Sequence, residues 1–455
     1  MKSFPLLLVF VVSTLFFSCH KSELSPEDNL DVFVDNSVNS NYVSIETAEF
    51  EVLAFVSDVD RVTKADIPAR RISSKYSIGG YVQTKEGEES SPLVYVFNFA
   101  DDRGFALASG DRRVSPVLCV TDRGSLNKGD VIDNPGLIMF LSEYEAYYKA
   151  LTEKQSIANS EQIVKTKWIE PITILDPEDP DGPGIPPTHW EYGDWKTVSY
   201  AGTILPCQWS QEWPFNIYCY TKDQKEANVG CVAVAVGQIM YYWGKNYTYD
   251  GIYYDWDKMH EIKQTSAYPI GESWEKVQRL LSALGAKDNL DMNYDKEDGS
   301  GAYRTNTPRT FENFGYVSGG SIQDYDFNTL KKNLAYGPAL GFGNCFKNVN
   351  VTSFLGIQID KKTWYSGGHA WVFDQAFEQR QEVKTYQGDR LINTRNNPRY
   401  MVHINWGWGG LYDGYYLSGV FNTSRSVDIT KGTTVTGTDD NYQFKLQMNC
   451  GIRAY

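Results

Sequence analysis

Cys231 stands directly after a glycine and opens a stretch, CVAVAVGQIMYYW, that is apolar almost throughout. Its apolar residues recur with the three- and four-residue spacing of a buried helix face, which predicts an α-helix with the cysteine in its first turn. Backbone N–H groups lack partners in that turn, and the helix dipole favours negative charge. The position therefore suits a nucleophilic thiolate, although a small cysteine packed in a core would produce the same pattern.

A helix N-terminus cannot ionise this thiol by itself. An ordinary cysteine has a pKa of about 8.5, and lowering it to about 4 requires roughly 6 kcal/mol of preferential thiolate stabilisation. A helix N-terminus supplies about 0.3–2 kcal/mol. Nucleophilic chemistry at Cys231 therefore requires a nearby imidazolium, so a histidine must share the site.

The chain has five histidines, and their surroundings differ. His20, His189 and His260 lie in polar stretches, where we expect them to be solvated. His369, in SGGHAWVFDQAF, follows two glycines and begins a predicted strand, so it is the candidate general base and acid. His403, in MVHINWGWGG, is interpreted as a core histidine bonded to the backbone.

A Cys–His pair also needs an orienting group and an oxyanion donor. Asn405, in INWGWGG, could accept a hydrogen bond from one imidazole nitrogen and fix its tautomer, with Trp406 shielding that bond from water. The backbone N–H of Cys231 is an oxyanion donor by position. A glutamine from CQWSQEWPFN, either Gln208 or Gln211, would complete the oxyanion hole.

The first part of the chain predicts export. Residues 1–18 combine Lys2 with a short apolar run, as in a secretory signal. Ser18 and Cys19 follow, and this pair resembles the processing site of bacterial lipoproteins, so we expect Cys19 to be lipidated. Residues 19–42 are polar and would form a flexible tether. Without lipidation the product would be secreted and soluble.

Two folded units are expected beyond the tether. Residues 43–170 predict a small α+β unit, with a helix from about Ile45, a strand–turn–strand pattern in PLVYVFNFADDRGFALASGD and a second helix capped by Asn134. Residues 171–190 are dense in Pro, Gly and Asp and predict an exposed linker open to proteolysis. Residues 191–455 form the larger unit.

Composition excludes several classes of function. The net charge of -14 and the lack of a basic stripe argue against a nucleic-acid partner. The chain has neither a C-x-x-C pair nor an H-E-x-x-H motif, so we expect no metal site and no cofactor. Cys207 and Cys219 are the local candidates for a disulfide in an exported protein.

Three motifs resemble the streptopain family of secreted bacterial cysteine proteases, peptidase family C10. They are GCVAVAVGQIMYYW, GGHAWVFDQ and INWGWGG with DGYY shortly after, in that order. The resemblance implies a two-lobed, papain-like α+β domain with a helical part and an antiparallel sheet. It implies an endopeptidase with Cys231 as nucleophile and His369 as general base and acid. It also implies Gln211 as oxyanion donor and an orienting pair of Asn405 and Trp406.

Other segments are similar to further parts of that family. NYDKEDGSGAYRT resembles its substrate loop, which implies that Ser300, Gly301 and Gly368 line the substrate cleft. GFALASGDRRVSPVLCVTDRGSL resembles its inhibitory pro-domain, which implies a latent zymogen that is cleaved between about Lys165 and Tyr192, with protein or peptide substrates. A polar hairpin insertion at 378–400 has no role assigned by the resemblance.

Two other functions fit the same residues. A Cys–His amidase acting on peptidoglycan peptides would use the same pair of side chains. An inactive protease fold could serve as a binding lipoprotein. In each case we expect an exported protein held by a lipid on Cys19, at the outer membrane or cell surface, or else periplasmic or released.

Overall fold

The structure is a computed structural model that describes residues 42–63, 68–79, 92–112, 114–145, 148, 188–295, 299–343, 353–360, 368–421 and 446–455. The expected signal segment, the lipidation site at Cys19 and most of the tether and linker lie outside these residues. None of the helices in the described ranges is long and apolar enough to cross a membrane.

A helix packed on an antiparallel sheet forms the N-terminal region. The elements are α1 (Ile45–Thr63), β1 (Ile72–Gly79), β2 (Pro92–Phe99), β3 (Phe105–Ser109) and β4 (Val117–Thr121). Each strand pairs antiparallel with the next. The expected turn between β2 and β3 is confirmed, since Asp102 and Gly104 have φ angles of 54° and 87°. A further helical stretch covers 135–145, and the Asn134 side chain caps it by accepting from the Leu137 N–H over 2.9 Å.

The helical part of the larger unit surrounds one almost wholly buried helix, α3 (Cys231–Trp243). Around it lie α4 (Trp256–Met259), α5 (Glu272–Leu284), α6 (Thr307–Asn313), η1 (Arg304–Asn306) and the hairpin β7 (Tyr247–Tyr249) and β8 (Ile252–Tyr254). The helix predicted from the apolar spacing is confirmed. Its burial on all sides explains why the stretch lacks a polar face.

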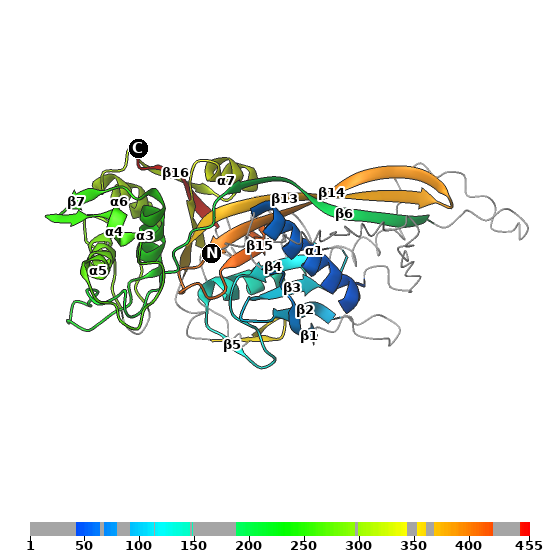
Figure 1. The fold of residues 1–455 in the computed structure, drawn as a ribbon, viewed down its shortest axis with the longest axis horizontal. Coiled ribbons are helices and arrows are strands. Elements are labelled where there is room, and N and C mark those ends of the chain that lie inside the picture. Colours follow the sequence, from blue (N-terminus) through cyan, green and yellow to red (C-terminus); the bar gives the residue numbers. More distant parts are fainter. Residues whose placement is uncertain are drawn as a thin grey trace, which may run out of the picture. The chain divides into compact units, whose positions relative to one another are not determined.

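The sheet part of the larger unit is antiparallel. It contains β9 (Ser318–Asp324), β10 (Ala339–Gly343), β13 (His369–Gln387), β14 (Arg390–Asn405), β15 (Gly414–Leu417) and β16 (Gln447–Arg453), with α7 (Phe327–Leu334) packed on it. Shorter elements of this unit are β11 (Ser353–Phe354), β12 (Ile357–Ile359) and η2 (Ser418–Phe421). β5 (Val131–Ile132) of the N-terminal region pairs parallel with β12. A helical part beside an antiparallel sheet confirms the expected α+β class (Figure 1).

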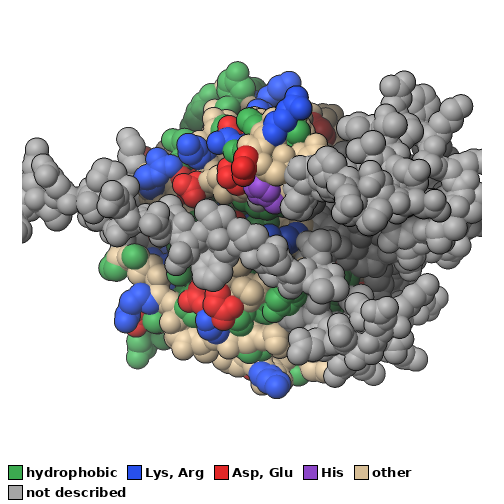
Figure 2. Space-filling view, turned by 90° about the vertical axis from the view of Figure 1, so that its right-hand side faces the viewer, with side chains coloured by type: hydrophobic (Ala, Val, Ile, Leu, Met, Phe, Trp, Pro, Cys, Tyr) green, Lys and Arg blue, Asp and Glu red, His purple; other side chains and the backbone are tan. Residues whose placement is uncertain are grey.

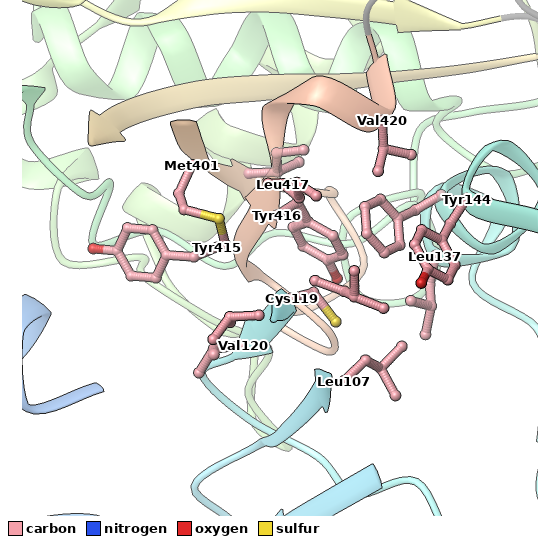
Figure 3. Packing of buried hydrophobic residues seen from close by; sticks show 14 of the residues in the cluster. Leu107, Cys119, Val120, Leu137, Tyr144, Met401, Tyr415, Tyr416, Leu417 and Val420 are labelled. Carbon is pink, nitrogen blue, oxygen red and sulfur yellow. The ribbon is translucent and has the colours of Figure 1, made fainter. Parts of the chain in front are cut away.

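The two expected units share one sheet. β15 pairs antiparallel with β4, with Tyr415 opposite Val120, so the N-terminal strands continue directly into the strands of the larger unit. They also share one hydrophobic core, in which Leu107, Cys119 and Leu137 meet Tyr416 and Val420 (Figure 3). The N-terminal region is therefore joined to the larger unit by a sheet edge and a common apolar interior.

The predicted hairpin at 378–400 is confirmed as the outer part of β13 and β14. β6 (Thr188–Gly202) runs along β13 and makes it a three-stranded ribbon. The predicted linker over residues 171–190 is wrong at its end, because Thr188, His189 and Trp190 belong to a strand that pairs with β13. Acidic and basic side chains are interspersed on the face drawn in Figure 2.

Candidate active site

Cys231 is the first residue of α3, and a glycine is required before it. Gly230 has a φ of 89°, and a Cβ at that position would come within 2.9 Å of the Ser300 carbonyl oxygen and 3.0 Å of Met292 Sδ. The predicted substrate loop therefore lies directly against the start of α3. Of the other residues predicted for the cleft, Gly301 pairs with Asn293 and Gly368 immediately precedes β13.

The thiol of Cys231 lies beside the start of β13. Backbone N–H groups of Ala370 and Val232 donate to it, and these bonds favour the thiolate. Burial outweighs them and raises the pKa of the Cys231 thiol. Ala370 is the residue after His369, so the fold brings the predicted nucleophile and the predicted base to one place, as the spacing along the chain could not show.

His369 is buried among three tryptophans. Its ring centroid lies 6.3 Å from that of Trp371, 6.1 Å from Trp406 and 6.4 Å from Trp408. Burial lowers the pKa of His369 to about 4, so the ring is neutral at neutral pH. Nε2 lies 2.9 Å from the Trp406 carbonyl oxygen. Because a carbonyl can only accept, Nε2 carries the proton and Nδ1 keeps its lone pair.

The pair is therefore neutral in the full-length chain. Within the described residues, no hydrogen bond joins the thiol to the imidazole, whereas the sequence led us to expect a thiolate–imidazolium pair. Burial explains the difference, because it disfavours the charged form of both groups.

The side chain of Asn405 differs from the expected orienting role. Its Oδ1 accepts from Gln238 Nε2 and from the Gly407 N–H, each over 3.0 Å. Its Nδ2 donates to the Cys207 carbonyl over 2.8 Å. In the described structure the acceptor for His369 is instead the neighbouring Trp406 carbonyl. Sequence alone suggested an amide acceptor, since it cannot show that a backbone carbonyl occupies the same position.

Two glutamines were candidates for the oxyanion hole. Gln211 is buried. Its backbone carbonyl accepts a hydrogen bond from the Val229 N–H over 2.8 Å, which holds Gln211 close to the segment just before Cys231. Gln208 instead packs against the turn at Gly410, where an added Cβ would lie 2.5 Å from its Cδ.

The candidate disulfide between Cys207 and Cys219 is not formed. Both cysteines are buried free thiols.

Comparisons with known proteins match two regions of the chain. Residues 209–416 match the sequence model of the Peptidase C10 family, and residues 40–148 match that of the Spi protease inhibitor. Residues 209–416 therefore assign the peptidase region to the peptidase C10 family. The chain is a cysteine-type endopeptidase, and its N-terminal region is a pro-domain.

Several relatives resemble the chain over most of its length. Thiol protease/hemagglutinin PrtT of Porphyromonas gingivalis is 26% identical over 74% of this chain, which spans only 35% of that protein. Streptopain of Streptococcus pyogenes serotype M1 is 21% identical over 74% of this chain and 77% of its own length.

Two solved structures from Prevotella intermedia are also similar. A prointerpain A fragment is 18% identical with a TM-score of 0.42, covering 84% of this chain and 99% of the fragment. Active interpain A is 18% identical with a TM-score of 0.33, covering 57% and 96%.

The pro-domain reaches the site through its second helical stretch. A Cβ on Gly136 would lie only 2.0 Å from Trp406 Cε3, so the helix backbone rests directly on that indole. A Cβ on Gly343, which pairs with His369, would lie 2.3 Å from Met139 Sδ. The sequence showed the helix cap at Asn134 but could not show which surface the helix covers.

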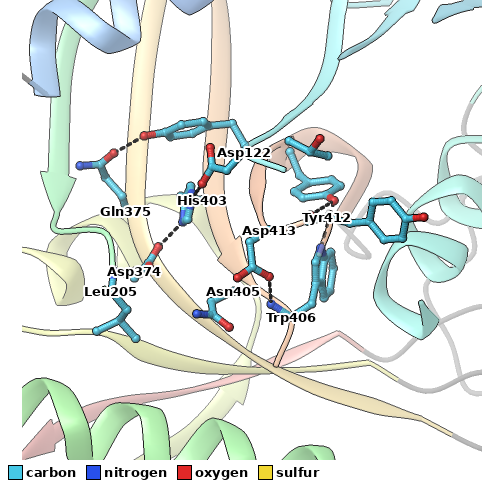
Figure 4. A network of polar contacts seen from close by, with 12 residues as sticks. Asp122, Leu205, Asp374, Gln375, His403, Asn405, Trp406, Tyr412 and Asp413 are labelled. Carbon is cyan, nitrogen blue, oxygen red and sulfur yellow. Dashed lines mark hydrogen bonds and ion pairs between the residues drawn. The ribbon is translucent and has the colours of Figure 1, made fainter. Parts of the chain in front are cut away.

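A buried charged array also joins the pro-domain to the peptidase region (Figure 4). His403 Nδ1 lies 2.6 Å from Asp374 Oδ1, and its Nε2 lies 2.9 Å from Asp122 Oδ2 of the pro-domain. The two carboxylates hold the pKa of His403 well above its ordinary value, against the effect of burial. The expectation of backbone partners for His403 is therefore wrong, because two distant segments bring carboxylates to its ring.

Two other histidines are placed by the fold as well. His260 was expected to be solvated, but it is only partly exposed, because its Nε2 lies 2.7 Å from the Tyr241 carbonyl oxygen. His189 is exposed, as expected, and it stacks on Tyr386. Neither of them lies among the contacts of Cys231 described above.

Proposed function

We propose that the chain is exported as a latent zymogen and that its trimmed form hydrolyses proteins through Cys231 and His369. In the first step His369 Nδ1 takes the thiol proton and the thiolate attacks a peptide carbonyl carbon. The backbone N–H of Cys231 and the Gln211 amide would stabilise the oxyanion that forms. His369 then gives its proton to the leaving amine as the C–N bond breaks, which leaves a thioester on Cys231.

The second half of the cycle reverses these roles. His369 takes a proton from water, the hydroxide attacks the thioester, and the acid is released as the thiol is restored. One observation carries this proposal: the Cys231 thiol is bonded to the backbone of Ala370, while the neighbouring His369 holds its proton on Nε2 and keeps Nδ1 as a base. Ser300, Gly301 and Gly368 would line the cleft beside that thiol.

Latency has a physical basis in the burial of this pair. The imidazole is buried and Cys231 is half-buried, and the loss of solvent around each group shifts its pKa in the direction that favours the neutral form. The helical stretch 135–145 packs on Trp406, which belongs to the wall of the His369 site. Cleavage between about Lys165 and Tyr192, by the enzyme itself, would release residues 43–170 and let water reach both groups.

Localisation follows from the first residues of the chain. The secretory signal at 1–18 and the Ser18–Cys19 pair support export with a lipid on Cys19 and a tether over residues 19–42. The peptidase domain would be 191–455, with residues 171–190 as the linker that is cut. The protein would then act at the outer membrane or cell surface, with protein or peptide substrates.

The test compares the full chain before and after trimming with Cys231→Ala and His369→Ala. We expect the full chain to be almost inactive on casein, the trimmed enzyme to hydrolyse it, and both variants to be inactive. An epoxide inhibitor should label Cys231 of the trimmed wild type only. Cleavage of purified peptidoglycan but not casein would instead indicate an amidase. Labelling no faster than that of an ordinary exposed thiol would indicate a binding lipoprotein.

Lipidation is tested separately, by following incorporation of a labelled fatty acid into the expressed chain. Wild type should incorporate the label and Cys19→Ala should not. Equal incorporation by both would contradict the proposed anchor.

A further inference from the structure

A buried carboxamide on α3 joins the three segments that carry the candidate site. Gln238 follows Cys231 by about two helical turns and is fully buried, with 0% of its surface exposed. Its Nε2 donates to Asn405 Oδ1 over 3.0 Å, and its Oε1 accepts from the Trp209 N–H over 3.2 Å. One side chain thus connects the helix of the nucleophile to the end of β14 and to the segment that leads to Gln211.

Backbone groups set the direction of each hydrogen bond made by Gln238 and Asn405. The Gly407 N–H can only donate and the Cys207 carbonyl can only accept, so Asn405 must present Oδ1 to the first and Nδ2 to the second. Gln238 must therefore donate to Asn405 with Nε2. Its Oε1 then faces the Trp209 N–H, which is again a donor. Neither amide can flip without losing bonds at both ends.

This chain of bonds ends at the acceptor for the imidazole. The Gly407 N–H and the Trp406 carbonyl belong to the same planar peptide unit, so fixing one of them fixes the direction of the other. Asn405 Oδ1 holds that N–H, and the carbonyl accepts from His369 Nε2 over 2.9 Å. The Trp406 N–H is held separately by Asp413 Oδ1 over 2.8 Å. Gln238 therefore acts on His369 through two intermediate groups.

We propose that Gln238 is a positioning residue. It orients His369 through Asn405 and the Trp406–Gly407 peptide unit, and it fixes the imidazole relative to the helix that begins at Cys231. The inference rests on the proposed roles of Cys231 and His369. No substrate contact is assigned to Gln238. Its two hydrogen bonds fix the acceptor of the imidazole and the segment before Gln211 relative to the helix of the candidate nucleophile.

Two substitutions separate the bonds of Gln238. Gln238→Met keeps the length of the side chain and removes both bonds. Gln238→Glu keeps an acceptor for the Trp209 N–H, but its second oxygen faces Asn405 Oδ1. A protonated Glu could still donate to Asn405, whereas an ionised one would repel it. Burial raises the pKa of a carboxyl group, so the introduced Glu should stay protonated at low pH. Gln238→Glu should therefore be active at low pH and lose activity as the pH rises and the carboxyl group ionises.

The experiment measures kcat, KM and the pH profile of kcat/KM with a peptide substrate, for enzyme and variants that have all been trimmed by an added protease. We expect Gln238→Met to lower kcat about ten- to hundredfold with KM almost unchanged, since misplaced catalytic groups have effects of this size. Gln238→Glu should lose kcat with rising pH, over a range where wild type gains it. Gln375→Met is the matched control, because Gln375 is a buried glutamine bonded to Tyr415 and Gly202 in the sheet. It should lower stability without changing the pH profile.

Each outcome decides one point. If His369→Ala keeps wild-type activity, the proposed function fails. If His369→Ala is inactive while both Gln238 variants keep the kcat and pH profile of wild type, the positioning role alone is refuted. An equal loss of kcat in Gln375→Met would also refute it, since the effect would then follow from lost stability. Should Gln238→Met fail to fold, the pH profile of Gln238→Glu decides the question.

Discussion

Gly136→Ala should weaken the hold of the pro-domain on the site. A methyl group there would lie 2.0 Å from Trp406 Cε3 and 2.4 Å from Cδ2, whereas carbon atoms in contact stay well beyond 3 Å. The indole cannot easily move away, because it is fully buried and its Nε1 donates to the Tyr416 hydroxyl over 3.0 Å. The helical stretch 135–145 must therefore shift, or the indole must leave its place beside His369.

The size of the effect follows from the cost of overpacking. Inserting a methyl group into a filled core costs about 1–3 kcal/mol. At about 1.36 kcal/mol per factor of ten, the undocked fraction of the pro-domain should rise about 5- to 150-fold. If only undocked molecules are cleaved, the rate of self-processing should rise by the same factor.

The assay follows conversion of the full chain to the trimmed form, together with labelling of Cys231 in the uncleaved chain. Gly193→Ala is the control, because its methyl would make ordinary contacts with Glu382, at 3.4 Å from the carbonyl oxygen and 3.7 Å from Cβ. Trimmed enzyme from Gly136→Ala should match wild type, since residue 136 has been removed. Unchanged processing, labelling and thermal stability of the full-length Gly136→Ala variant would refute the reasoning.

Two further predictions concern the charged array and the oxyanion hole. Asp122→Asn should destabilise the full chain by about 1–3 kcal/mol and leave the trimmed enzyme unaffected, because it removes one of the two carboxylates paired with the buried His403. The raised pKa of His403 contributes stability that is fully present below pH 6.5 and is lost as the pH rises through the raised value. The lowered pKa of Asp122 contributes stability that is present above pH 3.8 and is lost as the pH falls through the lowered value. Thermal melts across this range should therefore show a loss at both ends for wild type. The fall at the acid end should be smaller in Asp122→Asn, and a fall as large as that of wild type would contradict this assignment. Gln211→Ala in the trimmed enzyme should lower kcat about 10²- to 10³-fold with little change in KM, and a loss below tenfold would remove Gln211 from the oxyanion hole.

Local patterns in the sequence were sufficient for several elements. The spacing of apolar residues predicted α3, the cap at Asn134 predicted the helix that follows it, and the Asp102–Gly104 pattern predicted the turn between β2 and β3. Each of these depends on residues within a few positions of one another. The placement of a thiol in the first turn of a helix could be predicted for the same reason.

Contacts between distant segments could not be predicted in this way. His403 was read as a core histidine with backbone partners, yet its ring lies between Asp374 and Asp122, the second of which is 281 residues away along the chain. Asn405 was assigned to His369, yet its amide is held by Gln238, 167 residues away. Residue type alone indicates that a side chain can form a hydrogen bond, but it does not indicate the partner.

The sequence by itself indicated the candidate residues for the chemistry and the local elements that present them, because helix periodicity, caps and turns depend on neighbouring residues. Only the tertiary structure decided the protonation of the Cys231 and His369 pair, the acceptor of the imidazole proton and the shared sheet of pro-domain and peptidase. These features depend on burial and on strand pairing between distant segments. Burial is a property of the packed molecule, so it is settled only when the whole chain has folded.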